Sequence, residues 1–237
     1  MNFNALLEYV NTTPLTWLLL TLISYKIGII IYTKFDKHTL LQPIIISYII
    51  ILSAILITDT SYSEYFKSVE IINFFLGPAT VSLALPLYNN LEYVKTLFVP
   101  ILLTLVITVI FSITVAVGLL WILDAEIPTI LSMTTKSVTA PIAIITSKQI
   151  GAIPSLAIGF VIMTGIFGAI MGTTVFKLIK IKHDTSKGFA LGMVSHAIGT
   201  ARAVEISEKA AAFSALAMGA SGIFTAITLP IIINLLS

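Results

Sequence analysis

Four stretches of at least 20 residues carry neither a charged residue nor a Gly-Pro interruption, and they constrain the fold more than any other feature. Each is long enough to cross a bilayer as a helix, which takes roughly 20 apolar residues. Residues 15–33, interrupted by Lys26, and residues 71–90, interrupted by Gly77 and Pro78, are two further candidates. The uncharged stretches are residues 39–58, 96–123, 149–176 and 210–237. The sequence therefore predicts an all-α polytopic membrane protein with about six to eight membrane segments.

The amino-acid composition is also that of an integral membrane protein. Hydrophobic residues make up 57% of the sequence and charged residues 10%, against roughly 25% charged residues in soluble domains. The alternating pattern of membrane β-barrels does not occur. The net charge of +2 is too small to indicate a nucleic-acid partner. We expect residues 1–237 to form a single integral membrane domain.

Two basic loops set the predicted orientation. They contain Lys34, Lys37 and His38 in one, and Lys177, Lys180, Lys182, His183 and Lys187 in the other. The positive-inside rule places both in the cytoplasm. Five apolar segments lie between them, and five crossings would put the loops on opposite sides, so one segment should not cross. Residues 127–151, with Lys136 and Pro141 inside, are the weakest span, and we expect a re-entrant or broken helix there.

A second broken segment is expected at about residues 188–212, around the stretch SHAIGTARAVE. Residues 137–151 show a weak internal similarity to residues 198–212, and GIFGAI at 165–170 is similar to GIFTAI at 222–227. Each unit would be a broken segment followed by a full span. Such units, opposed across the membrane, are typical of inverted-repeat secondary transporters, whose binding sites lie at the midplane between interrupted helices.

Ionisable and hydroxyl residues in these breaks suit a small organic anion. A half-helix that starts at a break offers free N–H groups and a positive dipole end. Lys136 and Arg202 add full positive charges, and a guanidinium can hold a carboxylate with two hydrogen bonds. The remaining candidates for binding are Ser137, Thr139, Gly199, Thr200, His196 and Asn73, and Glu205 and Glu208 are candidates for proton or ion coupling.

Structural roles compete with these assignments. Arg202 can pair with Glu205 or Glu208 to hold the bundle, or lie at the interface where long side chains reach water. A backbone carbonyl can satisfy the ring of His196. Asn73 belongs to a stretch in which we expect Gly77 and Pro78 to start or break a helix, and its neighbours serve helix packing equally well.

No enzyme signature occurs in the sequence. It lacks a paired-carboxylate site, a nucleophile elbow and a phosphate-binding loop, and its three histidines have no metal-ligand spacing. We therefore expect no catalysis, no cofactor and no metal.

Several blocks resemble the LrgB/CidB family of bacterial membrane proteins. They are FLGPATVSLALPLYNN, KSVTAPIA, GFALGMVSHAIGTARAVE and AAAFSALAMGASGIFTAITLP. The resemblance extends from about residue 15 to the end of the chain. It implies a multi-pass protein of the bacterial cytoplasmic membrane, antiholin-like, and linked to murein hydrolase activity and autolysis. It also implies a holin-like partner of the LrgA/CidA type, and it connects the chain to plastid relatives that move glycolate and glycerate and bacterial relatives associated with pyruvate.

Two functions follow from these observations. The first is a secondary transporter of a small monocarboxylate, in which the two broken segments bind the anion and move between access states. The second is a non-transporting regulatory subunit that acts on the holin-like partner. A polar cavity at the midplane between the breaks favours the transporter. Long uncharged spans at 96–123 and 210–237 leave room for packing in a homo-oligomer.

Overall fold

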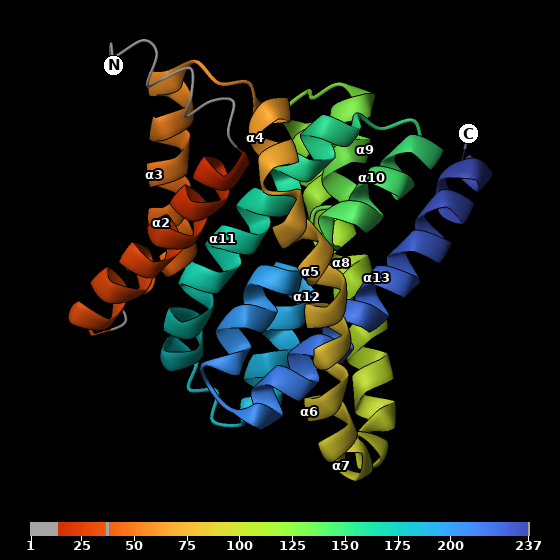
Figure 1. Cartoon of the computed structure of the whole chain (residues 1–237). Coiled ribbons are helices and arrows are strands. Elements are labelled where there is room, and N and C mark those ends of the chain that lie inside the picture. Colours follow the sequence, from red (N-terminus) through yellow and green to blue (C-terminus); the bar gives the residue numbers. More distant parts are fainter. Residues whose placement is uncertain (1–13, 37, 237) are drawn as a thin grey trace, which may run out of the picture. The chain divides into compact units, whose positions relative to one another are not determined.

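The computed structural model describes residues 14–36 and 38–236, and every regular element in this part of the chain is helical (Figure 1). The elements are α2 Pro14–Lys34, η1 Thr39–Leu41, α3 Pro43–Thr58, α4 Tyr62–Ser68, α5 Glu70–Ser82, α6 Ala84–Asn89, α7 Leu91–Thr96, α8 Phe98–Ile122, α9 Ile127–Thr134, α10 Ala140–Gln149, α11 Pro154–Leu178, α12 Asp184–Val204 and α13 Glu208–Leu236.

Five of these segments have the length and composition of membrane spans, and a sixth is shorter. The five are α2, the stretch Glu70–Asn89, α8, α11 and α13, and the apolar helix α3 is the sixth. Large apolar side chains such as Phe111, Trp121 and Phe167 lie more than half exposed on their surfaces, which is stable only in contact with lipid. The prediction of an all-α polytopic membrane protein is therefore confirmed.

The described chain forms two compact units, divided after Ser82. In the first, α2 and α3 form a hairpin whose backbones approach so closely that a Cβ on Gly28 would lie 2.8 Å from the Cα of Pro43. Trp17 is 1% exposed and packs edge-on against Tyr65, with ring centroids 5.6 Å apart. The expected single membrane domain stays a prediction.

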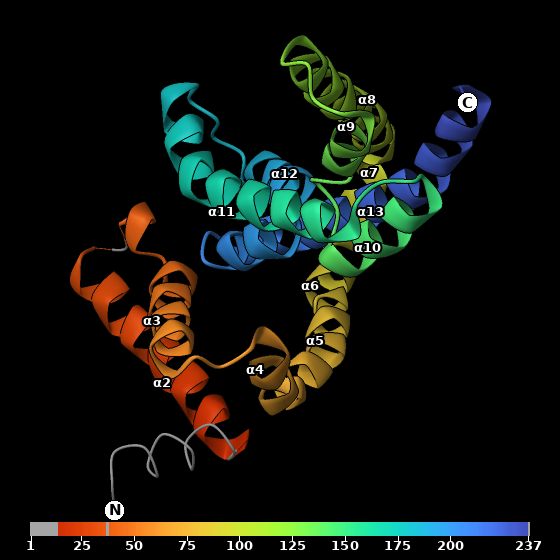
Figure 2. The same ribbon diagram turned by 90° about the horizontal axis from the view of Figure 1, so that it is seen from above.

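The second unit, from residue 83 onwards, holds both segments that we expected to be broken (Figures 1 and 2). Its main core joins α8, α12 and α13 through Leu105, Val109, Phe189, Met193 and Phe213. On α11, a buried stripe recurs every fourth residue at Ala157, Val161, Gly165 and Ala169. This spacing puts the stripe on one helix face, and the opposite face is left for lipid.

The helix α5 continues through Gly77 and Pro78, which corrects our expectation of a start or break at these residues. The interruption falls at Leu83, between α5 and α6. A proline removes one backbone hydrogen bond, and membrane helices tolerate this because neighbouring groups satisfy the freed carbonyl. The side chain of Asn73 lies outside the described part of the structure, so its place among the candidates stays a prediction.

Neither α9 nor α10 crosses a membrane. They have 8 and 10 residues, or about 12 and 15 Å at 1.5 Å per residue, against a hydrocarbon core of about 30 Å. Three candidate spans, Glu70–Asn89, α8 and α11, and the shorter apolar helix α3 then remain between the two basic loops. With α3 counted as a crossing the number is even, which keeps both loops on one side, as the positive-inside rule requires.

Candidate functional site

The first break lies between α9 and α10, at residues 135–139. Its residue Val138 is 2% exposed and packs against Ala143 and against Val161 in α11. The next turn brings the side chain of Ile142 to Gly222, near the middle of α13. In Figure 1 both short helices lie at the end of the unit where α13 ends. The segment therefore consists of two short helices joined by a turn beside the middle of α13, and its re-entrant course stays a prediction.

The second break lies within α12, at His196, whose backbone has φ 41° and ψ −124°. The chain folds back there, because a Cβ on Gly199 would overlap the carbonyl oxygen of Leu191, eight residues earlier. In a continuous helix these residues would be about 12 Å apart. This position lies within the segment of about residues 188–212 in which we expected a break. Gly199 instead permits the close approach of the two arms.

Small residues hold the first arm of α12 between α11 and α13. Gly188 and Gly192 approach the backbone of Ala210 and Ser214 so closely that any Cβ would overlap a carbonyl oxygen. On the other side, a Cβ on Gly165 would lie 2.8 Å from the ring of His196. Close packing of small residues is the main source of helix association in membranes. The turn of α12 is therefore fixed beside the middle of α11.

Hydrogen bonds at this turn are internal to the bundle. The ring of His196 donates from Nε2 to the carbonyl of Val161 over 3.0 Å. Thr200 donates to the carbonyl of His196 over 2.8 Å and lies 2.9 Å from the hydroxyl of Ser214 in α13. Both side chains are buried. Their contacts fasten the turn to its neighbours, which is the structural role that we set against ligand binding for His196.

A small cavity of about 20 Å³ lies between α8, the first break, the first arm of α12 and α13. Of its ten lining residues, six carry a hydroxyl group. These are Thr108 and Ser112 from α8, Thr134 from the end of α9, Ser137 from the first break, and Ser221 and Thr225 from α13. Met193, from the first arm of α12, also lines it. A cavity of this size holds about one water molecule, so a monocarboxylate does not fit in this conformation.

Lys136 is not among the lining residues, but it bonds to two of them. Its ammonium group donates to the hydroxyl of Ser112 over 2.7 Å and to that of Ser137 over 3.1 Å. Within the described part of the chain, no carboxylate pairs with Lys136. Thr139 occupies the N-cap position of α10, but its side chain makes no capping hydrogen bond. The first break therefore presents a cation and hydroxyl donors to the cavity.

Arg202 does not lie at the second break. It is in the last turn of α12 and forms an ion pair with Glu205. Six residues of helix separate it from the break, a rise of about 9 Å, and it is not among the residues that line the cavity. A cation in the last turn is favoured by the helix dipole. The expectation that Lys136 and Arg202 hold one anion stays a prediction.

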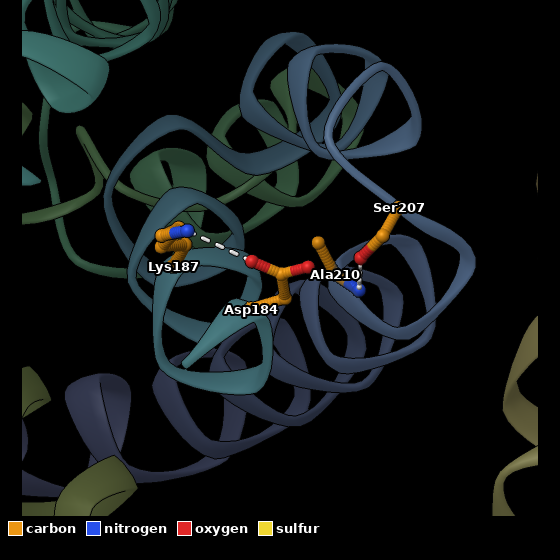
Figure 3. A network of polar contacts seen from close by, with 4 residues as sticks. All are labelled: Asp184, Lys187, Ser207 and Ala210. Carbon is orange, nitrogen blue, oxygen red and sulfur yellow. Dashed lines mark hydrogen bonds and ion pairs between the residues drawn. The ribbon is translucent and has the colours of Figure 1, made fainter. Parts of the chain in front are cut away.

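The two candidate coupling carboxylates lie at the base of the second hairpin. Glu205 caps the end of α12, and Glu208 begins α13 and accepts a hydrogen bond from Asn89 over 3.0 Å. Nearby, Lys187 donates to Asp184 over 2.8 Å, and the hydroxyl of Ser207 caps α13 at the amide of Ala210 (Figure 3). This network joins the start of the hairpin to the start of α13. A role of Glu205 or Glu208 in coupling stays a prediction.

The internal similarity in sequence does not follow the helices. Residues 137–151 cover part of a break and α10, whereas residues 198–212 cover the end of α12, a loop and the start of α13. Lys148 and Lys209, which the similarity pairs, therefore lie on elements of different kind. The two hairpins are alike in form, since each is followed by a membrane-length helix, and the inverted repeat stays a prediction.

Sequence reasoning missed the hydroxyl residues of the cavity that lie on full spans. Thr108, Ser112, Ser221 and Thr225 were counted only as uncharged members of membrane helices. A signal for two of them was present, because Thr104, Thr108 and Ser112 recur at intervals of four and so lie on one face of α8. No group of three or more possible metal ligands occurs among the described residues.

The helices define a multi-pass α-helical membrane protein with a small hydroxyl-lined cavity between the first break and the first arm of α12. The model of the LrgB-like family matches residues 21–235, and the chain belongs to this family.

Relatives match over most of their length. The chain is 31% identical to "Holin-like protein CidB" of Staphylococcus epidermidis over 219 residues, 92% of this chain and 95% of the relative. It is 29% identical to "Antiholin-like protein LrgB" of Bacillus subtilis (strain 168) over 224 residues, 94% of this chain and 97% of the relative. None of these printed names is that of an enzyme. No solved structure has significant similarity to the chain.

Proposed function

We propose that this protein transports small monocarboxylates of the pyruvate, glycolate and glycerate type, and that this flux is linked to the control of murein hydrolase activity and autolysis. One observation carries the transport proposal. The ammonium group of Lys136 donates to Ser112 and Ser137, which line a cavity next to the first break, and it has no carboxylate partner among the described residues.

The electrostatic argument concerns the cost of this charge. A cation at membrane depth costs about 2.5–3.5 kcal/mol on insertion scales. Bonds to Ser112 and Ser137 solvate the ammonium group without neutralising it. A carboxylate would neutralise it, and the surrounding hydroxyls would donate to the second carboxylate oxygen and to the 2-hydroxyl or 2-oxo group of the substrate.

The cavity volume of about 20 Å³ sets a requirement on the mechanism. Because the anion does not fit this conformation, a hairpin must move to admit it. Hairpins that enter from opposite sides supply the two access states of a secondary transporter. The backbone contact between the first arm of α12 and α13 is the contact that such a movement would change.

Reconstitution tests the proposal. Purified protein in proteoliposomes is expected to take up labelled pyruvate, glycolate or glycerate. Lys136→Met keeps the length of the side chain and removes its charge, and we expect at least a tenfold loss of uptake. Lys148→Met is the matched control, because Lys148 is an exposed lysine in α10, and its uptake should equal that of wild type. Absence of uptake for all three anions, or full uptake by Lys136→Met, would refute the proposal.

The names of the relatives favour a second function, that of a non-transporting antiholin-like subunit acting on a holin-like partner of the LrgA/CidA type. This function needs an interaction surface and no substrate cavity. Its test is dye release from vesicles that contain the partner, with and without this protein. Unchanged release, together with failure to co-purify, would count against it.

A further inference from the structure

A groove of about 350 Å³ runs along the second unit between α8, α12 and α13. At one end it is bordered by Leu97 and Pro100, near the start of α8, and by Thr185 and Ser186, at the start of α12. The start of α12 directly follows the basic loop at residues 177–183, which is cytoplasmic by the positive-inside rule. The groove therefore opens toward the cytoplasmic side of the membrane.

At its other end the groove meets the polar cavity. Thr108 and Met193 line both spaces. Met193 is 3% exposed and belongs to the core cluster that includes Phe189 and Phe213. It stands three residues before the break at His196. Met193 and Thr108 therefore lie between the wide groove and the cavity.

A line of hydroxyl groups follows α8 from one space into the other. Thr104 lines the groove, Thr108 borders both spaces, and Ser112 lines the cavity. Their spacing of four residues puts them on one helix face, with about 6 Å of rise between neighbours. The line ends at the ammonium group of Lys136, which donates to Ser112.

We propose that this groove is the cytoplasmic entrance for the anion and that Met193 is the gate between the entrance and the Lys136 cavity. A methionine suits a gate, because its unbranched thioether chain changes rotamer easily and packs in many shapes. The conformation described here is open to the cytoplasm as far as Met193 and closed beyond it. The identity of the cargo rests on the proposed function, whereas the course of the groove does not.

Cysteine labelling tests the entrance directly, because the chain has no cysteine of its own. A thiol reacts with a membrane-impermeant maleimide only where water permits the thiolate to form. In inside-out vesicles, Thr104→Cys and Ser186→Cys should label. Ile107→Cys, 64% exposed on α8 outside the groove lining, is the lipid-facing control and should not label. Labelling of Thr104→Cys only from the outer side, or at the rate of Ile107→Cys, would overturn the entrance.

The gate needs a probe behind it. Thr225→Cys, in the cavity, should label at least tenfold more slowly than Thr104→Cys, and adding Met193→Ala should remove most of that difference. Met193→Leu, which keeps the bulk, should leave the labelling slow. If Thr225→Cys labels at the same rate in the Met193→Ala background as in the background with Met193, the proposed gate is overturned. Equal melting temperatures in detergent show that the variants are folded.

The labelling and transport experiments test the entrance and the transport function separately. Labelling in the expected pattern without uptake of any carboxylate would refute the transport function and leave the groove in place. Uptake together with an unlabelled groove would refute the entrance and leave the function in place.

Discussion

The contact between α12 and α13 depends on the missing side chain of Gly192, and replacing it tests the packing of the second hairpin. A Cβ at this position would stand 2.2 Å from the carbonyl oxygen of Ser214. A carbon and a carbonyl oxygen in contact stay about 3.3–3.6 Å apart. Gly192→Ala would therefore push the two helices apart by about 1.1–1.4 Å.

The energetic consequence follows from the loss of contact. A gap of about 0.5–1 Å forfeits a quarter to a half of the dispersion energy of the atoms that face it. Within lipid, no hydrophobic force between the helices compensates for this loss of dispersion energy. Overpacking costs about 1–3 kcal/mol, and the better helix propensity of alanine returns at most about 1 kcal/mol. We expect Gly192→Ala to lower the free energy of unfolding by up to about 2 kcal/mol.

The matched control is Gly219→Ala in α13. A Cβ there meets nothing within 4 Å, so the substitution should be neutral or stabilise by up to about 1 kcal/mol through helix propensity. The measurement is unfolding of the two variants and wild type in mixed micelles under increasing SDS. If Gly192→Ala is as stable as Gly219→Ala, the close approach of the helices is not as described.

Three further outcomes are expected. Thr200→Val should destabilise the protein by about 1–2 kcal/mol in the same assay, because it leaves the hydroxyl of Ser214 without the partner 2.9 Å away. Thr200→Ser should restore most of the lost stability. A Thr200→Val variant as stable as wild type would contradict the contact. Hydrogen bonds from Lys187 and Ser207 lower the pKa of Asp184, so the stabilisation by its carboxylate is present above the ordinary aspartate pKa and is lost as pH falls through the lowered pKa. The difference in unfolding free energy between wild type and Asp184→Asn should therefore shrink on acidification. A difference that grows on acidification would contradict this prediction. Ser61→Ala removes one half of the capping box of α4 and should lower stability by about 0.5–2 kcal/mol. Ser61→Asp should retain the cap. Equal protease sensitivity of Ser61→Ala and wild type near residue 61 would count against the role of the cap.

Much of the architecture could be predicted because membrane insertion depends on local composition. A run of about 20 uncharged residues has few options in lipid other than a helix, so all six apolar segments fall on helices. The failure of residues 127–151 to cross followed from counting segments between two basic loops. Lys136 was found for the same reason, because a cation within an apolar segment is rare and visible in sequence.

The positions at which the hairpins turn were decided by tertiary contacts. Gly199 and Thr200 are the turn-forming residues in sequence, yet the chain turns at His196, where the ring bonds to the carbonyl of Val161 in α11. Sequence also offered Arg202 as a second anion ligand. The structure takes it to the base of the hairpin, because the distance along a helix from break to side chain is fixed only once the turn is fixed.

By itself, then, the sequence determined that this protein is a bundle of membrane helices with two interrupted segments and a cation in the first of them, since hydropathy and charge are properties of single residues and their neighbours. Only the tertiary structure decided which hydroxyl groups line the cavity beside that cation. Thr108, Ser112, Ser221 and Thr225 come from two spans more than 100 positions apart, and their convergence depends on how α8 and α13 are rotated, which is set by side-chain packing between the helices.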